Sequence, residues 1–256
     1  MSSSQAFANK AIAITGAGSG IGRATALYLG QRGASLAISD VNKTSVDAVA
    51  AAILAEVPSA TVIASAVDVS KADEVKSWIE KTAAHFGRLD GAANIAGTGG
   101  NEEPVALDAQ TDDGWNFVLN INLTGTMYCL REELRVISEG GSIVNTSSVL
   151  GLRSSPTPGD SPYVTSKHGV LGLTRTVARE YGHKNIRVNC VNPGAIATSM
   201  MGANDGEEKP LPEYIQPPIN RWGTPHEVAQ LIGFLLGDES RYINGTSVVI
   251  DGGLIC

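Results

Sequence analysis

Short apolar runs alternate with longer amphipathic stretches along the first hundred residues. Runs of strand length cover residues 10–15, 34–39, 61–67 and 89–97, the last of which includes a turn. Between them, helical periodicity predicts helices over residues 21–33, 46–57 and 72–87. In the first of these helices, Ile21, Ala24, Leu27 and Tyr28 form the predicted apolar face.

The second half of the chain repeats this alternation. The same patterns predict helices over residues 112–137, 162–181 and 225–236, and strands over residues 142–148, 186–194 and 247–251. Regular strand–helix alternation is typical of a parallel sheet that is covered by helices on both faces. We therefore predict an α/β fold: a single doubly wound, Rossmann-type domain over residues 1–256 with a seven-stranded parallel sheet.

The segment over residues 199–220 departs from the alternation. It contains four prolines and the adjacent pair Met200 and Met201. Long loops in compact domains are usually either lids over a functional site or disordered segments. We expect this segment to be a substrate-lid loop whose methionines pack it onto the core.

Charge and cysteine content exclude several classes of protein. The formal net charge is −7 and the isoelectric point is about 5.1, which disfavours nucleic acid as a partner. Cys129, Cys190 and Cys256 are far apart and odd in number, which indicates reduced thiols in the cytoplasm and no zinc site. The first residues do not resemble a secretory signal, and no apolar run reaches the ~20 residues of a membrane span. We thus expect no metal and no membrane association.

A glycine-rich turn, TGAGSGIG over residues 15–22, follows the first predicted strand and opens the first helix. It does not match the generic G-x-G-x-x-G fingerprint in any register. Missing side chains would still let a dinucleotide pyrophosphate approach the backbone N–H groups at the helix start. The alternative is a flexible turn without a ligand.

Asp40 ends the second predicted strand, eighteen residues after Gly22. An acidic side chain there suits hydrogen bonding to the ribose hydroxyls of NAD and would repel the 2′-phosphate of NADP. Val41 follows it, and Lys43 is expected to face away on the next helix. These residues favour NAD, although an aspartate at a strand end could instead cap the following helix.

Tyr163 and Lys167 are four residues apart in the segment YVTSK, within a predicted helix, so they share a face. The spacing fits an ordinary surface pair. It also fits a catalytic acid, because a nearby ammonium and a positive nicotinamide ring would lower a tyrosine pKa from its usual value of about 10.

Several motifs in consistent order resemble the short-chain dehydrogenase/reductase family over nearly the whole chain. They are TGAGSGIG, DV at residues 68–69, NIAG at 94–97, NLTG with Asn122, NTSS with Ser148, YVTSK, PGAIAT at 193–198 and VIDGG near the C-terminus. Ile95 departs from the family's NNAG pattern. The interval of fifteen residues between Ser148 and Tyr163 is longer than is usual in the family.

This resemblance implies roles for individual residues. Tyr163 would exchange a proton with the substrate, and Lys167 would lower the Tyr163 pKa and hold the nicotinamide ribose. Ser148 would hydrogen-bond the reacting oxygen, and Asn122 would anchor a water in a proton relay. The predicted cofactor-binding residues are Gly16, Ser19, Gly20, Ile21, Asp40, Val41, Asp68, Val69, Asn94, Ala96, Gly97, Thr146, Tyr163, Lys167, Pro193, Gly194, Ile196 and Thr198.

Two of these assignments leave alternatives open. The longer interval leaves Ser147 as an alternative to Ser148, and both could form a plain turn at a strand end. Asn122 could be a buried amide at a helix kink. The histidines are expected to be structural or exposed: His85, His168, His183 and His226.

The resemblance implies an NAD(H)-dependent oxidoreductase that interconverts a secondary alcohol and a ketone. The expected pocket lies between residues 98–101, residues 150–158, Tyr163, Ala195 and the lid. Its apolar members favour a bulky, neutral, cyclic substrate such as a steroid or terpenoid. The alternatives are an NADPH-dependent ketoacyl-type reductase and a non-catalytic NAD-binding scaffold or redox sensor. The family implies a homotetramer, or a homodimer, formed through the helices over residues 112–137 and 162–181.

Overall fold

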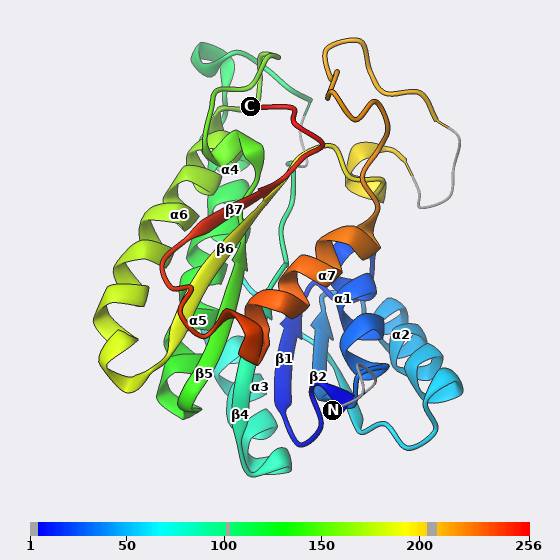
Figure 1. Ribbon diagram of the computed structural model, residues 1–256. Coiled ribbons are helices and arrows are strands. Elements are labelled where there is room, and N and C mark those ends of the chain that lie inside the picture. Colours follow the sequence, from blue (N-terminus) through cyan, green and yellow to red (C-terminus); the bar gives the residue numbers. More distant parts are fainter. Residues whose placement is uncertain (1–4, 101–102, 204–208) are drawn as a thin grey trace.

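Seven parallel strands form one sheet in the computed structural model, which describes residues 5–100, 103–203 and 209–256 (Figure 1). The strand order is β3-β2-β1-β4-β5-β6-β7. The strands are β1 (Ala11–Thr15), β2 (Ser35–Asp40), β3 (Val62–Ala66), β4 (Leu89–Asn94), β5 (Ile137–Thr146), β6 (Arg187–Pro193) and β7 (Ser247–Ile250). The predicted doubly wound parallel sheet is confirmed. Asn101 of the predicted pocket and residues 204–208 of the predicted lid lie outside the described residues.

Helices cover both faces of the sheet. They are α1 (Gly20–Gly30), α2 (Lys43–Glu56), α3 (Ala72–Phe86), α4 (Asp112–Leu119), α5 (Gly125–Val136), α6 (Ser161–Tyr181) and α7 (Pro225–Leu236). Side chains of α1, α2 and α7 belong to one core cluster, with Ile12 and Ile14 of β1. Side chains of α3, α5 and α6 belong to the other, with Ala13 and Ala37. Alternation along β1 and β2 thus directs large residues to the first face and alanines to the second.

Helix α1 is buried on two sides. The predicted apolar side, which includes Leu27 and Tyr28, is only partly buried and packs against the core. Its fully buried side carries Ala26 and Leu29. The Tyr28 ring packs so closely over Gly233 of α7 that a Cβ there would lie only 2.4 Å from Tyr28 Cε1, so any larger residue would require the ring to move.

The predicted helix over residues 112–137 is interrupted. Helix α4 leads into a π-helical turn, Asn120–Thr124, and α5 continues from it. Ile137 is already the first residue of β5, so that strand begins earlier than the pattern predicts. A π turn contains an extra residue in the helix, which often marks a functional position. Here the turn carries the predicted residue Asn122.

The chain order reverses between β1 and β4, because β2 and β3 lie on one side of β1 and β4 to β7 on the other. The carboxyl ends of these central strands lie together, since Thr15 pairs with Asn94 and Asn94 with Asn145. Ligands of open α/β sheets bind in the crevice at such a reversal point. In the described part of the chain, no helix is both long enough and apolar enough to cross a membrane.

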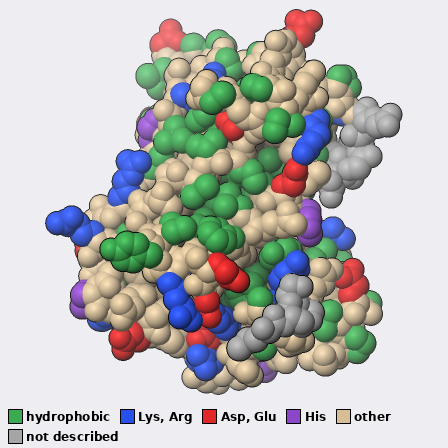
Figure 2. Space-filling model, in the orientation of Figure 1, with side chains coloured by type: hydrophobic (Ala, Val, Ile, Leu, Met, Phe, Trp, Pro, Cys, Tyr) green, Lys and Arg blue, Asp and Glu red, His purple; other side chains and the backbone are tan. Residues whose placement is uncertain are grey.

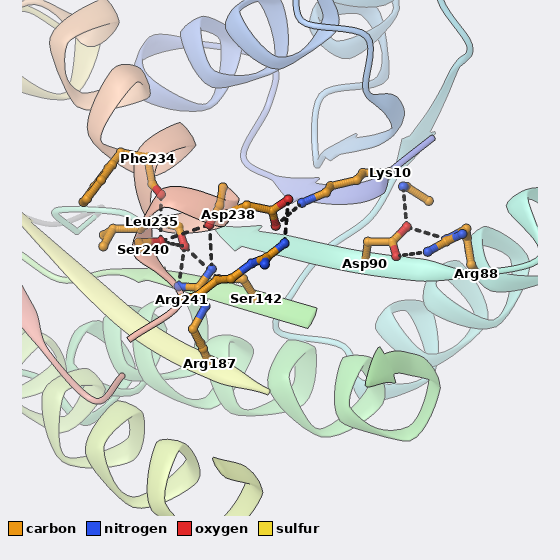
Figure 3. Close-up of polar contacts among 12 residues, drawn as sticks. Lys10, Arg88, Asp90, Ser142, Arg187, Phe234, Leu235, Asp238, Ser240 and Arg241 are labelled. Carbon is orange, nitrogen blue, oxygen red and sulfur yellow. Dashed lines mark hydrogen bonds and ion pairs between the residues drawn. The ribbon is translucent and has the colours of Figure 1, made fainter. Parts of the chain in front are cut away.

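A second group of polar side chains lies toward the amino ends of the central strands, at the other end of the sheet from this crevice (Figure 3). Arg187, at the start of β6, donates hydrogen bonds to the Leu235 and Gly237 carbonyls at the end of α7. Ser142 also donates to the Leu235 carbonyl, at 2.9 Å. These bonds satisfy carbonyl groups that a helix end leaves without intrahelical partners, and they attach α7 to the sheet.

A line of polar side chains crosses the core beneath the site. Glu133 of α5 is fully buried, and its Oε2 accepts a hydrogen bond from Asn94 Nδ2 at 3.1 Å. Asn94 also donates to Asn145, which donates to Thr174 of α6. Burial raises the pKa of Glu133 to about 8, although the Asn94 hydrogen bond opposes this change. Glu133 is therefore mainly protonated at neutral pH.

We predict that Glu133→Gln makes the stability of the protein less sensitive to a rise in pH from 4.5 to about 8. The Glu133 pKa is raised from 4.5 to about 8, so the folded state retains a proton that the unfolded state releases. The free energy of unfolding should therefore fall as the pH rises between these values, and Gln should remove this contribution. Thermal unfolding across that range should show a smaller loss of Tm in the variant. The exposed Glu80→Gln variant is the control, and equal losses in all three proteins would contradict the prediction.

Candidate active site

The turn after β1 packs directly against the turn after β4. Thr15 Oγ1 accepts hydrogen bonds from the backbone N–H groups of Ile95 and Ala96, at 3.1 and 3.2 Å. Gly16 has a φ of +66°, and a Cβ on it would lie 2.8 Å from the Ala96 nitrogen. Glycine is required here both by the backbone conformation and by the close approach of the two turns.

The same turn meets the loop that follows β6. Gly20 has a φ of +48°, and a Cβ on it would lie 3.1 Å from Thr198 Cγ2. Ser19 occupies the N-cap of α1, but its side chain makes no capping hydrogen bond. Helix α1 thus begins with uncapped N–H groups beside small residues and a threonine, which fits an anionic pyrophosphate. Ile21, the next predicted contact, is partly buried against the core.

The Asp40 carboxylate closes the other end of this turn. Its Oδ2 accepts a hydrogen bond from the Gly18 N–H, and its Oδ1 accepts one from the Asn42 N–H, both at 2.9 Å. Helix α2 is capped by the Asn42 side chain, which accepts from the Ser45 N–H. Asp40 is therefore not the side-chain cap of α2. Val41 beside it is 73% exposed, which provides an apolar surface next to the acid.

Three of the predicted cofactor residues have structural roles for their side chains. Asn94 is held in the core by Glu133 and Asn145, so its amide does not extend from the strand end. Asp68 accepts hydrogen bonds from the Ser70 N–H and hydroxyl at the start of α3. Val69 is buried against Gly125. Sequence alone could not separate these contacts from cofactor contacts, because strand ends also carry caps and packing residues.

The loop after β6 is held by its neighbours. Gly194 donates to the Ile250 carbonyl at 3.0 Å, and a Cβ on Gly194 would lie 2.6 Å from Asp251. Ile196 pairs with Gly223 in an isolated bridge, while Pro193 ends β6. These contacts place Thr198 over Gly20.

Lys167 is not part of a surface pair. It is 4% exposed, and its Nζ donates to the Thr146 carbonyl at 3.0 Å. The same nitrogen lies 5.5 Å from the centroid of the Tyr163 ring. A Cβ on Gly97 would lie 3.4 Å from Nζ, so the loop after β4 passes directly beside the ammonium. The Thr146 hydroxyl beside it is buried and has no hydrogen-bond partner.

The pKa of Tyr163 differs in direction from the prediction. Burial raises it, a hydrogen bond with Ser148 lowers it, and the charge of Asp160 raises it further. Burial also lowers the pKa of Lys167, to about 8. In the chain by itself, burial therefore outweighs the expected lowering of the Tyr163 pKa, and the effect of Lys167 together with a bound nicotinamide stays a prediction. The physical reason is that removing the phenol from water disfavours its charged form.

The structure distinguishes the two adjacent serines. Ser147 donates its hydroxyl to the Lys167 carbonyl at 2.8 Å, which attaches helix α6 to the end of β5. Ser148 hydrogen-bonds Tyr163 and accepts from the Leu150 N–H at 3.1 Å. Of the two, Ser148 lies beside the phenol.

Asn122 is a buried amide in the π turn, which agrees with the interpretation of this residue as a buried amide at a helix kink. Its Oδ1 accepts from the Thr98 N–H at 2.8 Å, and its Nδ2 donates to the Thr98 carbonyl at 2.9 Å. Nδ2 also donates to Ser166 Oγ at 3.1 Å, and Ser166 donates to the Tyr163 carbonyl at 2.7 Å. Ser166 is fully buried and was not predicted. Its position in the YVTSK segment was the only available signal.

A cavity of about 900 Å³ lies between the predicted lid and the residues that follow it. It is lined by residues 209–213, 215–217 and 220–224 together with Ala197. Tyr163, Ser148 and residues 98–100 do not line it, so it differs from the predicted pocket. Among the described residues, no three His, Cys, Asp or Glu side chains lie close enough together to bind a metal. His168 and His183 bond only to backbone carbonyls, and His226 packs on Tyr28.

The chain is similar to proteins of one family over almost its full length. The sequence model of a family described as enoyl-(acyl carrier protein) reductase matches residues 16–255. The short-chain dehydrogenase/reductase aba4 of Botryotinia fuckeliana is 44% identical, covering 99% of this chain and 100% of its own. Cyclohexanol dehydrogenase of Acinetobacter sp. (strain SE19) is 39% identical, covering 97% and 96%.

Solved structures agree with this similarity. The crystal structure of levodione reductase has a TM-score of 0.89 at 41% identity and covers 96% of this chain and 98% of its own. A short-chain dehydrogenase from Burkholderia cenocepacia J2315, in complex with NADP, is 33% identical with a TM-score of 0.90. The match covers 98% of this chain and 100% of that one. Carveol dehydrogenase from Mycobacterium avium, in complex with NAD, is 29% identical with a TM-score of 0.88. The match covers 97% of this chain and 98% of that one. The chain is a member of the short-chain dehydrogenase/reductase family, whose oxidoreductases use a nicotinamide cofactor.

Proposed function

We propose that this protein is an NAD(H)-dependent oxidoreductase that interconverts a secondary alcohol and a ketone. The observation that carries the proposal is the arrangement around Tyr163. Ser148 acts on its phenol, whose pKa it lowers, and the phenol lies one helical turn before a buried ammonium, Lys167. This group adjoins the crevice formed by the glycine turn and the ends of the central strands.

Tyr163 and Ser148 handle the substrate oxygen. A bound nicotinamide supplies or accepts the hydride at the substrate carbon. In the reduction direction, Tyr163 donates its phenolic proton to the carbonyl oxygen, and the Ser148 hydroxyl hydrogen-bonds that oxygen as it gains charge. In the oxidation direction, Tyr163 receives the hydroxyl proton. The raised pKa of Tyr163 favours its protonated form, which is the form needed for reduction.

Lys167 and Asn122 support these steps. The Lys167 ammonium uses one hydrogen bond on the Thr146 carbonyl and has further donors for a ribose hydroxyl. Its positive charge stabilises the phenolate that reduction leaves on Tyr163. The Asn122 side chain is fully engaged with Thr98 and Ser166, so it acts by holding the 98–100 loop and helix α6 in register. The water relay implied for Asn122 stays a proposal.

NAD is favoured over NADP by the position of Asp40. Its carboxylate faces the glycine turn at Gly18, where the ribose hydroxyls of an adenosine would lie. A 2′-phosphate there would meet a negative charge. The neighbouring Lys43 is paired with Asp47 on α2, so it does not compensate this charge.

A bulky, neutral, cyclic substrate fits the apolar surroundings. Leu152, Met200 and Ile219 are exposed apolar side chains on the segments expected to form the pocket and lid, residues 150–158 and 199–220. The names cyclohexanol dehydrogenase and levodione reductase, carried by relatives, support a cyclic alcohol or ketone. The enoyl-(acyl carrier protein) reductase description of the matching family favours a second candidate, an NADPH-dependent reductase of acyl substrates. Asp40 and the net charge of −7 oppose that candidate.

We also propose a single cytoplasmic catalytic domain that assembles as a homotetramer or homodimer. A Cβ added at Gly172 on α6 would meet open space, and Phe117 on α4 is exposed, so both helices have faces available to a second copy. Hydrophobic side chains also gather on the face over β7 and α7, where Val249 and Phe234 are exposed (Figure 2). The three cysteines are free thiols, which suits the cytoplasm.

We predict that Tyr163→Phe abolishes turnover while cofactor binding survives. The phenyl ring fills the same space but has no proton to exchange, so kcat should fall at least about 100-fold. NADH binding, followed by its fluorescence, should change little. Tyr242→Phe is the control, because Tyr242 is fully exposed. Unchanged turnover in Tyr163→Phe would exclude this mechanism.

We predict that Asp40→Asn shifts the cofactor preference toward NADP. The amide removes the charge that repels the 2′-phosphate, and it hydrogen-bonds ribose hydroxyls less strongly than a carboxylate. The ratio of NAD to NADP affinity should fall by roughly tenfold, which equals about 1.4 kcal/mol. Glu56→Gln, an exposed acid at the far end of α2, is the control. An unchanged ratio would mean that Asp40 does not select the cofactor.

A further inference from the structure

The VIDGG motif near the C-terminus has no part in the chemistry proposed above. After β7 the chain forms a tight turn over residues 251–255. The Asp251 carboxylate accepts hydrogen bonds from the backbone N–H groups of Gly253 and Ile255, at 2.8 and 3.0 Å. Aspartate commonly stabilises turns in this way, and an ionised acceptor strengthens such bonds. One side chain therefore holds the C-terminal turn in a defined conformation.

This C-terminal turn packs directly against the last residues of the predicted lid. Gly252 and Gly253 have φ values of +66° and +88°, a region that other residues rarely adopt. A Cβ on Gly252 would lie 3.3 Å from the Cβ atoms of both Pro217 and Ile219. A Cβ on Gly253 would lie 3.1 Å from Pro218 Cγ. The two glycines thus allow the turn to approach residues 217–219 closely.

A backbone hydrogen bond joins the same two segments. The Ile219 N–H donates to the Gly252 carbonyl at 3.0 Å. Pro217 is buried, but Pro218 and Ile219 after it are exposed. The C-terminal turn therefore supplies a fixed attachment to a part of the lid that is mostly exposed to solvent.

The other side of the C-terminal turn meets the loop after β6, which carries predicted cofactor contacts. The Gly194 N–H donates to the Ile250 carbonyl at 3.0 Å, and a Cβ on Gly194 would lie 2.6 Å from Asp251 Cβ. The chain then continues through Thr198 into the lid. The C-terminal turn thus lies between the start of this loop and residues 217–219, and it holds the far end of the lid beside the loop.

We propose that Asp251 is a positioning residue for the substrate. By holding the C-terminal turn, it keeps residues 217–219 of the lid beside the cofactor loop and so shapes the wall against which a cyclic alcohol or ketone binds. This inference rests on the proposed function, in which the lid contacts the substrate. It makes the C-terminal turn part of the support of the substrate site.

Loosening the C-terminal turn should weaken substrate binding and spare the chemistry. Tyr163 and Lys167 lie on α6 and Ser148 follows β5, so the reacting groups keep their own supports. The backbone bond between Gly194 and Ile250 does not involve the Asp251 side chain. Loss of that side chain should therefore raise KM for the substrate and leave kcat and the KM for NAD⁺ nearly unchanged.

The test compares wild type with Asp251→Ala and Asp251→Asn. Alanine removes both acceptors, whereas asparagine keeps one oxygen for the Gly253 N–H and is the conservative rescue. Asp90→Ala is the matched control. The Asp90 carboxylate also accepts a backbone N–H, that of Ala11 at 2.8 Å, but it does so at the amino end of β4.

Two readouts are measured for each protein. The first is kcat and KM with NAD⁺ and two probe alcohols, cyclohexanol and the bulkier carveol. The second is amide hydrogen exchange of the segment over residues 214–222, followed by mass spectrometry, which reports the attachment of Ile219 without any turnover.

We expect Asp251→Ala to raise KM for both alcohols roughly tenfold, the order produced by loss of one hydrogen bond to a charged group. Its kcat and its KM for NAD⁺ should stay within about twofold of wild type. Exchange of residues 214–222 should become roughly tenfold faster, as the same loss of stability requires. Asp251→Asn should lie between wild type and Asp251→Ala. Asp90→Ala should lower Tm without changing KM or exchange in the lid.

Unchanged KM in a folded Asp251→Ala protein would overturn the inference, whether or not exchange becomes faster. An equal rise of KM in Asp90→Ala would also overturn it, because general destabilisation would then explain the effect. Tyr163→Phe, assayed in parallel, separates these failures from failure of the proposed function. An active Tyr163→Phe protein would refute the proton transfer, while KM and lid exchange would still decide the role of Asp251.

Discussion

The site depends on how helix α6 is attached to the carboxyl end of β5. Lys167 enters the core there, and a buried ammonium is unfavourable unless polar groups surround it. The Thr146 carbonyl accepts a hydrogen bond from Lys167 Nζ, and the Ser147 hydroxyl donates one to the backbone carbonyl of Lys167. The side chain and the backbone of Lys167 are therefore both bound to the end of β5. Burial lowers the Lys167 pKa to about 8, so the ammonium persists at neutral pH. With Lys167 held in this way, Tyr163 one turn earlier is placed beside Ser148.

The same attachment links distant parts of the chain. Asn122 in the π turn bonds both backbone groups of Thr98 and reaches α6 through Ser166. Thr15 holds the turn after β4 against the glycine turn. The reversal of strand order between β1 and β4 brings these turns to one crevice.

Much of the fold could be predicted because each strand and helix has a local signal. Gly87 ends α3 in the left-handed conformation, and Pro225 starts α7, as the pattern indicates. The break in the helix over residues 112–137 could not be predicted, because a π turn preserves helical periodicity on either side. The motif spacing located Tyr163, Lys167, Ser148 and Asn122, which the fold brings to one crevice.

The environment of each site residue could not be predicted from spacing. The Tyr163 pKa depends on desolvation, which is a property of the surrounding fold, so the upward shift caused by burial could not be predicted from the YVTSK spacing. Asn94 shares a motif with Ala96 and Gly97, but only the structure shows that Glu133 and Asn145 hold its amide in the core. Ser166 is signalled only by its place within the YVTSK segment, because its importance lies in the hydrogen bonds that it makes with Asn122 and with the Tyr163 carbonyl.

The central claim is that the crevice binds NAD and that the Tyr163 site uses it to oxidise or reduce a neutral cyclic substrate. The most direct measurement is NADH formation by the purified wild-type protein, supplied with NAD⁺ or NADP⁺ and a panel of cyclic secondary alcohols. The account predicts turnover of at least one bulky member with NAD⁺ and a much weaker signal with NADP⁺. Equal or faster turnover with NADP⁺, or turnover confined to acyl thioester substrates, would contradict it.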